Sequence, residues 1–312
     1  MIRYIIKRLL QLIPILVIVS VIIFGMVRLS KIDPVTVIIG DKRSTPAIIA
    51  QVREKYNFNK PIVTQYFMWV SGILRGDLGN DYKNKQSVAS LIASRLPVTG
   101  GLVLFSSIIS IILAIPIGVV TAIKKNTWVD KLLSVLTLIF AACPGFLASI
   151  ILILIISAVA PEFPFTGAFS NFGEYIQRMI FPSLALTFGI VALVSRVTRS
   201  SMIEQHQSSY SLTATAKGLP SAMVIFKHCF KNAVIPVITV FGIIVGSLIS
   251  GAVLVESVFS LPGIGSLLID GINQGNFPIV QDVTLMLVTV FLVLSMIVDV
   301  IYAIIDPRIR LK

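Results

Sequence analysis

Six long apolar runs constrain the fold of this chain more than any other feature of its sequence. They cover residues 9–27, 98–122, 131–160, 180–200, 232–256 and 281–305. About 20 apolar residues in an α-helix span the ~30 Å hydrocarbon core of a bilayer, and lipid offers the backbone no hydrogen-bond partner. The runs therefore predict an all-α polytopic membrane protein with six transmembrane helices.

The composition agrees with this class. Hydrophobic residues make up 56% of the 312 residues and charged residues only 13%, about half the charged fraction of a soluble domain. The net charge of +12 does not indicate nucleic-acid binding. The basic residues stand in short clusters beside the apolar runs, where they set the orientation in the membrane.

The placement of lysine and arginine predicts that orientation, because cytoplasmic loops are enriched in both. Clusters flank the runs on one side of the membrane: Arg3, Lys7 and Arg8; Lys124, Lys125 and Lys131; Arg196, Arg199, Lys217, Lys227 and Lys231; Arg308, Arg310 and Lys312. The short loops on the other side hold only Arg178. Both termini, and the loop between the fourth and fifth runs, are therefore expected in the cytoplasm.

Three parts follow from this arrangement. Residues 1–29 are expected to form an N-terminal transmembrane helix, and residues 30–97 an external subdomain. Residues 98–312 are expected to form a five-helix core, with a cytosolic loop at 202–231. The first run is expected to remain uncleaved, because residues 28–33 after it lack the small-x-small site of a signal peptide.

The external subdomain is expected to contain two helices, from Pro46 to about Tyr56 and from Pro61 to about Leu74. Apolar and aromatic side chains recur along the second helix at helical spacing, which indicates one inward face. The residues of that face are Tyr66, Trp69, Val70 and Ile73.

No motif in the sequence indicates catalysis or a bound metal. A P-loop, a Gly-x-Ser-x-Gly elbow and a His-Glu-x-x-His pair are all absent. Cys143 and Cys229 make no disulfide framework, and the two histidines show no metal-ligand spacing. The chain is expected not to be an enzyme, so as a transporter it would need a separate ATPase or an ion gradient.

The loop at 202–231 is the only long stretch of mixed polarity late in the chain. A short helix is predicted from Tyr210 to Lys217, ended by Gly218 at positive φ, with Pro220 in the first turn of a second short helix. A spacing of four puts Tyr210, Ala214 and Gly218 on one face, with Thr213 and Lys217 beside them. Such a small, weakly polar face suits docking to a soluble partner protein.

These residues resemble a known family. Tyr210-Ser-Leu-Thr-Ala-Thr-Ala-Lys-Gly-Leu219, followed by His228 and Lys231-Asn-Ala-Val-Ile-Pro236, is similar to the "EAA" coupling loop of ABC-importer permeases, the inner-membrane components of binding-protein-dependent transport systems. The closest variant is the B-type subunit of the dipeptide/oligopeptide/nickel permeases. Gly76-Asp-Leu-Gly79, the stretch from Glu256 to Gly265, and Asp306-Pro-Arg-Ile-Arg310 match family motifs too.

The chain departs from the family pattern at a few positions. Ser208 and Ser209 stand where an acidic residue commonly precedes the tyrosine, and Thr215 stands where arginine is usual. In the external segment, Leu261 replaces a usual tryptophan and Asn276 a usual aspartate.

The resemblance implies a role and partners. In this family the coupling loop docks into a cleft of an ATPase and passes its closure to the pore. It implies the ATPase-coupling residues Tyr210, Thr213, Ala214, Ala216, Lys217, Gly218, Leu219, His228 and Asn232. It also implies a second homologous permease in a heterodimer, two cytosolic ATPases that carry the ATP and magnesium, and an extracellular or periplasmic binding protein. The location implied is the bacterial inner membrane.

An external gate is a further expectation. Glu256 near the outer end of the fifth run either holds a gate with Pro262, Gly263 and Gly265 or caps the loop structurally, because an unpaired carboxylate is costly in lipid. Three other features stay open. Asp299 either pairs with a neighbouring helix or subunit or contacts substrate. Pro144 marks either a kink that lines a pathway or a packing kink. The small-residue stripe of Gly242, Gly246 and Gly251 packs against a partner permease or within this chain.

The resemblance favours di- or oligopeptides as the cargo of this permease, and two alternatives remain open. The same architecture would also serve nickel or a metal chelate. A stand-alone gradient-driven carrier or channel would instead show inverted repeats with charged or unwound sites in mid-membrane, and the sequence shows no such repeat. A membrane scaffold without transport leaves the Ala-x-Ala-Lys-Gly-Leu spacing unexplained.

Overall fold

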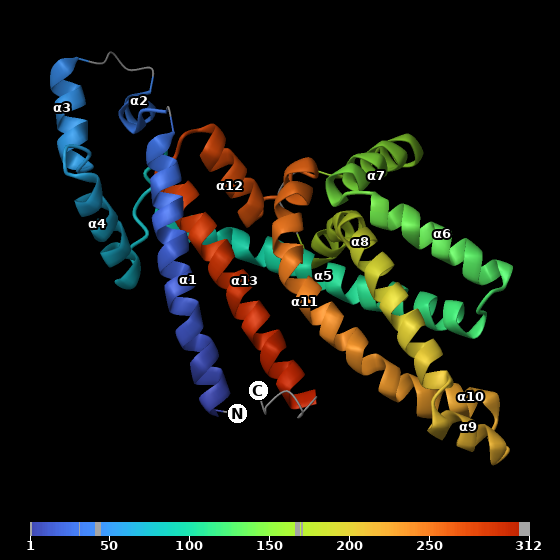
Figure 1. Ribbon diagram of the computed structural model, residues 1–312. Helices are drawn as coiled ribbons and strands as arrows, with labels where there is room; N and C mark the ends of the chain where they lie inside the picture. The colour runs from blue at the N-terminus through green and yellow to red at the C-terminus, as the bar shows by residue number, and fades with distance from the viewer. Residues whose placement is uncertain (1, 31, 41–44, 166–168, 170, 306–312) are drawn as a thin grey trace. The chain divides into compact units, whose positions relative to one another are not determined.

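The computed structural model describes residues 2–30, 32–40, 45–165, 169 and 171–305 (Figure 1). Over these residues the chain is helical, with one isolated β-bridge between Asn80 and Ser87 and no strand. The all-α prediction is confirmed. The Asp306–Arg310 motif and the C-terminal basic cluster lie outside the described residues.

Five helices are long and apolar enough to cross a membrane. The spans lie in α1 (Ile2–Leu29), α5 (Val88–Ile123), α8 (Phe172–His206), the helix that ends as α11 (Phe230–Val258), and α13 (Phe277–Ile305). Each contains one of the predicted apolar runs. The helices also extend beyond those runs. α5, for example, begins ten residues before residue 98, because Val88 and Ile92 are buried against Ile264 and Leu267.

The third run, predicted as one span with a proline kink, is divided into two helices. It forms α6 (Trp128–Ala142) and α7 (Gly145–Val159), which are bent by 105° at the two residues between them. Pro144 has no N–H to continue the ladder of α6 and stands as the N-cap of α7 with φ −60° and ψ 145°. The described residues thus hold five membrane spans, or six if the bent pair counts as one.

The chain divides into two compact units. One unit contains Met1–Thr99 and Pro262–Leu292, and the other contains Gly100–Leu261 and Val293–Lys312. The first unit contains α2 (Pro34–Ile39), α3 (Pro46–Lys55), α4 (Ile62–Leu74) and α12 (Ile264–Asn273). The two helices expected between residues 46 and 74 are confirmed.

In the first unit, α4 packs on α1 through aromatic side chains. Tyr66 and Trp69 contact Phe24 with ring centroids 5.5 and 5.8 Å apart, and the Tyr66 hydroxyl lies 2.8 Å from Ser20 Oγ. Trp69 Nε1 also donates to Asp282 Oδ1 of α13 at 2.7 Å. The predicted inward face of this helix is confirmed.

A buried polar contact connects the loop after α4 to the start of α13. The Asn276 side-chain amide donates to the Asp81 carboxylate, and the Asn276 side-chain oxygen accepts from the Tyr82 backbone N–H at 3.4 Å. Asp81 and Asn276 are both almost fully buried. Amide and carboxylate are complementary here, which gives a structural reason for asparagine in place of the family's aspartate.

In the second unit, α8 is the central helix and contacts α6, α7 and α11. Its Arg199 donates two hydrogen bonds, of 2.9 and 2.8 Å, to the buried Asp130 carboxylate in the first turn of α6. Glycines allow close packing in this unit. A Cβ on Gly242 of α11 would lie 2.5 Å from Val298 of α13, and one on Gly251 would lie 2.7 Å from Leu186 of α8. At these two glycines the small-residue stripe packs within this chain.

The Asp81–Asn276 contact yields a test. Asn276→Asp should destabilise the protein by about 1–3 kcal/mol, because it removes the donor to Asp81 and buries a second carboxylate against the first. Thermal unfolding of the purified protein in detergent would show a lower midpoint. Asp270→Asn on the exposed side of α12 is the matched control and should unfold like the wild type. Equal midpoints for the two variants would contradict this role of Asn276.

Candidate coupling site and external segment

The coupling segment, residues 202–231, is built around one helix end. α9 (Ser209–Ala216) stops at Lys217, and Gly218 follows with φ +78°. Gly218 N–H donates to Thr215 O at 2.9 Å, and Leu219 N–H donates to Ala214 O at 3.3 Å. This pair of bonds is the Schellman motif, which requires a left-handed residue that glycine adopts without strain. The predicted positive φ at Gly218 is confirmed.

One face of α9 is buried and the other is exposed. Ser211 and Ala214 are buried, and Ala214 belongs to an apolar cluster with Val224, Cys229 and other residues. Ala214 therefore does not belong to an exposed docking face, whereas Thr213, Lys217 and Gly218 of the predicted face are exposed. Docking of a partner on this face stays a prediction. The exposed face carries Leu212, Thr213, Thr215, Ala216 and Lys217.

Tyr210 and Leu219 hold the two ends of α9. The Tyr210 hydroxyl donates to Gln205 Oε1 at 2.6 Å, while the ring remains partly exposed. Leu219 is half-buried against the same apolar cluster as Ala214. This contact is the hydrophobic one that commonly accompanies a Schellman motif.

The second helix of the segment is not a separate short helix. α10 (Ser221–Met223) starts after Pro220, passes into the π-helix η1 (Val224–Cys229), and continues as α11. The backbone stays right-handed helical at Met223, Val224, Cys229 and Phe230. The prediction of two short helices is wrong for the second one, because the backbone stays helical from Ser221 through η1 into α11.

Side chains along α10 and the π-helix η1 differ in their exposure. Val224 and Cys229 are buried, whereas Met223, Phe226 and Lys227 are exposed. His228 is half-buried, and its carbonyl accepts from the exposed Asn232 side chain at 3.3 Å. π-helical turns occur often at functional sites, which is consistent with a functional role for this segment.

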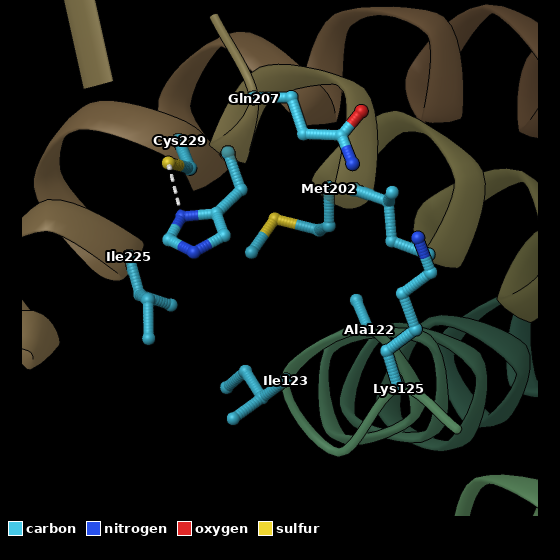
Figure 2. A pocket seen from close by; sticks show the side chains of 9 residues that line it. Ala122, Ile123, Lys125, Met202, Gln207, Ile225 and Cys229 are labelled. Atoms are coloured by element: carbon cyan, nitrogen blue, oxygen red, sulfur yellow. Dashed lines mark hydrogen bonds between the residues drawn. The ribbon is translucent and has the colours of Figure 1, made fainter. Parts of the chain in front are cut away.

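A hollow of about 200 Å³ lies between the coupling segment and the end of α5 (Figure 2). Met202, Gln207, Ile225 and Cys229 line it from the segment, and Ala122, Ile123 and Lys125 line it from the α5 side. Cys229 Sγ lies 4.0 Å from His206 Nδ1 and 3.5 Å from Ser211 Oγ. No group of three or more metal-ligating side chains occurs among the described residues.

The residues predicted for an external gate lie on α11 and at the start of α12. Glu256 is fully buried on α11, and its carbonyl accepts from Leu261 N–H at 2.9 Å in another Schellman-type helix end, with Ser260 at φ +52°. Pro262 and Gly263 precede α12, and Gly265 is buried in its first turn. Ile264 N–H donates to Thr99 Oγ1 at 2.8 Å. A gating role for these residues stays a prediction.

The long apolar helices define a multi-pass α-helical membrane protein. Comparison with known proteins narrows this class. A family model for the binding-protein-dependent transport system inner membrane component matches residues 114–311, and a model for the N-terminal part of such membrane components matches residues 1–103.

Full-length relatives agree with the family models. The glutathione transport system permease protein GsiC of Salmonella paratyphi A (strain ATCC 9150 / SARB42) is 35% identical over 312 residues, covering 100% of both chains. GsiC of Escherichia coli (strain K12) has the same identity and coverage. The chain belongs to the family of binding-protein-dependent inner-membrane permeases of ABC importers, of the peptide/nickel type. Such permeases are translocation subunits, not enzymes, and they work with a partner permease, ATPases and a binding protein.

Gly218 offers a direct test of the coupling segment. Gly218→Val should lower transport about tenfold, because forcing a β-branched residue into the left-handed region costs upward of about 1–2 kcal/mol and would remodel the end of α9. Gly218→Asn is the matched control and should transport nearly normally, since asparagine tolerates this conformation.

Both variants should reach the membrane in wild-type amounts, since a Cβ at Gly218 meets nothing within 4 Å. The measurements are cargo uptake and membrane level for each variant. Wild-type uptake by Gly218→Val would contradict the proposed geometry of this helix end.

Proposed function

We propose that this permease is half of an ATP-driven import pathway for short peptides, completed by a second, homologous permease. Two cytosolic ATPases would dock on the paired coupling segments, and an external binding protein would deliver the cargo. ATP and magnesium would be bound by the ATPase subunits and not by this chain.

The observation that carries the coupling role is the construction of the segment itself. The exposed side of α9, with Leu212, Thr213 and Lys217, is followed by the Gly218 turn and by one long helix from Ser221 to Val258. At 1.5 Å per residue, these 38 residues extend about 57 Å, enough to join an ATPase surface to the membrane interior. A push on α9 is thereby transmitted as a rigid-body movement of α11.

The orientation is part of the proposal. Lys124 and Lys125, at the end of α5, lie on the same side as the coupling segment with its Lys217 and Lys227. Basic clusters of this kind favour the cytoplasm. Both termini would then also be cytoplasmic, which places the segment where an ATPase can reach it.

The names of the relatives favour a peptide as the cargo. Glutathione is a short peptide, and the matched permeases are named for its transport. Nickel or a metal chelate is the alternative, since this family type includes such importers, but the matched relatives are not named for it. Selectivity among cargoes would rest largely with the binding protein.

Uptake in cells tests the proposal. A strain lacking this permease should lose uptake of a labelled dipeptide or of labelled glutathione and regain it with the wild-type chain, while uptake of radioactive nickel stays unchanged. Loss of nickel uptake alone would favour the metal alternative.

A matched control separates the energy sources. Replacing the phosphate-binding lysine of the partner ATPases should abolish the same uptake, because P-loop ATPases depend on this residue. Uptake that survives this change but collapses when the ion gradient is dissipated would contradict an ATP-driven importer.

A further inference from the structure

The helix break between α6 and α7 lies within the thickness of the membrane. Each helix has 15 residues and is about 22 Å long, less than the ~30 Å hydrocarbon core. α6 starts at Trp128, directly after the basic turn with Lys124 and Lys125, which belongs at a membrane surface. The break at Cys143 and Pro144 is therefore no more than about 22 Å from that surface.

The break leaves backbone polar groups without helical partners. The last four carbonyls of a helix and its first N–H groups have no bond within the ladder. At the end of α6, Phe140 O accepts from Cys143 N–H at 3.3 Å, and α7 begins without a side-chain cap. At membrane depth, irregular backbone of this kind is tolerated only where protein buries it or where it lines a water-filled cavity.

The break opens onto a hollow of about 580 Å³. Its walls come from the break itself, from α8 and from α11, and include small or polar residues: Cys143, Gly145, Gly189, Ser247 and Gly251. A site needs only about 10–15 Å³ of such volume to hold a water molecule. At Gly189, a Cβ would meet nothing within 4 Å, so the α8 wall is open at this point.

We propose that this hollow is a wet segment of the translocation pathway, in which the free backbone groups of the α6–α7 break hydrogen-bond to water and to the amide groups of a passing peptide. The passage of a peptide rests on the function proposed above, whereas the presence of water in the hollow does not. Carbonyl and N–H groups at the break match the N–H and carbonyl groups that a peptide must keep paired outside bulk water. A lipid chain or an apolar helix of the partner permease would leave them unpaired.

Cys143 is a built-in probe of this hollow. The chain has two cysteines, and Cys229 is fully buried, so Cys229→Ala leaves Cys143 as the single thiol. A charged, membrane-impermeant methanethiosulfonate should modify Cys143 in native membranes in at least one of two states, nucleotide-free or trapped with ATP and vanadate. Thiols react as thiolates, which form in water and not in lipid.

The matched control is Leu154→Cys in a chain without the native cysteines. Leu154 is 66% exposed on α7 and lies outside the hollow. The charged reagent should modify this cysteine about tenfold more slowly than Cys143, while an uncharged permeant reagent should modify both. If Cys143 resists the charged reagent in both states, the hollow is filled by lipid or by the partner permease, and the proposal is overturned.

Substitutions at Gly189 test whether cargo passes through the hollow, independently of whether the hollow contains water. Gly189→Leu places a side chain into open space and should lower peptide uptake about tenfold, whereas Gly189→Ala should stay near the wild-type rate, and both substitutions favour the helix over glycine. Gly25→Leu on α1, where a Cβ also meets nothing within 4 Å, is the control for a bulky substitution elsewhere.

The outcomes are distinguishable from those of the proposed function. If the wild-type chain imports no peptide but Cys143 reacts, the cargo assignment fails and the wet hollow stands. If peptides are imported and Gly189→Leu imports them at the wild-type rate, with the variant present at normal membrane levels, the pathway does not pass through this hollow.

Discussion

Backbone hydrogen bonding in hydrocarbon is the constraint on which this structure depends. Lipid cannot pair an N–H or carbonyl group, so a spanning segment must remain helical from end to end or stop where protein or water takes over. α5, α8 and the helix from Ser221 to Val258 meet this demand with 35 to 38 residues each. The places where helices end are therefore the places where this chain can do something other than cross the membrane.

Several of those ends are closed in one way. Schellman-type bonds with a residue at positive φ end α4 at Gly76, α9 at Gly218, α11 at Ser260 and α12 at Gly275. Each pairs carbonyls that a helix end would leave free and turns the chain sharply. The α6–α7 break differs, because Pro144 removes a donor and no left-handed residue closes the end of α6. Residues of this break line the hollow of about 580 Å³, where we propose that water is present.

The coupling segment combines a stiff end with a stiff connection. α9 is held by burial of Ser211 and Ala214 and by the Gly218 turn, and the next helix continues through η1 into α11. In such an arrangement, a force on the exposed face of α9 is not absorbed by a flexible loop. Under the proposed function, closure of ATPases docked on α9 would move α11, which contacts α8 and α7.

Much of this could be predicted from the sequence, because the determinants are local. Apolar length predicts the spans, and Gly218 predicts its own conformation, since only the residue at that position decides whether positive φ is strained. The burial of Ala214 could not be predicted, because an alanine fits an exposed or a buried face equally well. It is buried in a cluster with Val119, Val224 and Ala233, which lie on other helices. The extent of the bend at Pro144 is likewise set by packing on α8. Motif resemblance identified the coupling segment but not the Cys229–His206 pair beneath it, which no spacing signals.

Cross-linking along α9 measures the central claim most directly. Single cysteines at Leu212, Thr213, Ala216 and Lys217, in a chain without native cysteines, would be tested for cross-links to the ATPase in membranes, alongside cysteines at Ser211 and Ala214. The account predicts cross-links from the four exposed positions, with yields that change when ATP and vanadate are added, and none from the two buried ones. Modification of the exposed positions by an impermeant reagent applied from outside intact cells, together with no cross-link to the ATPase, would contradict it.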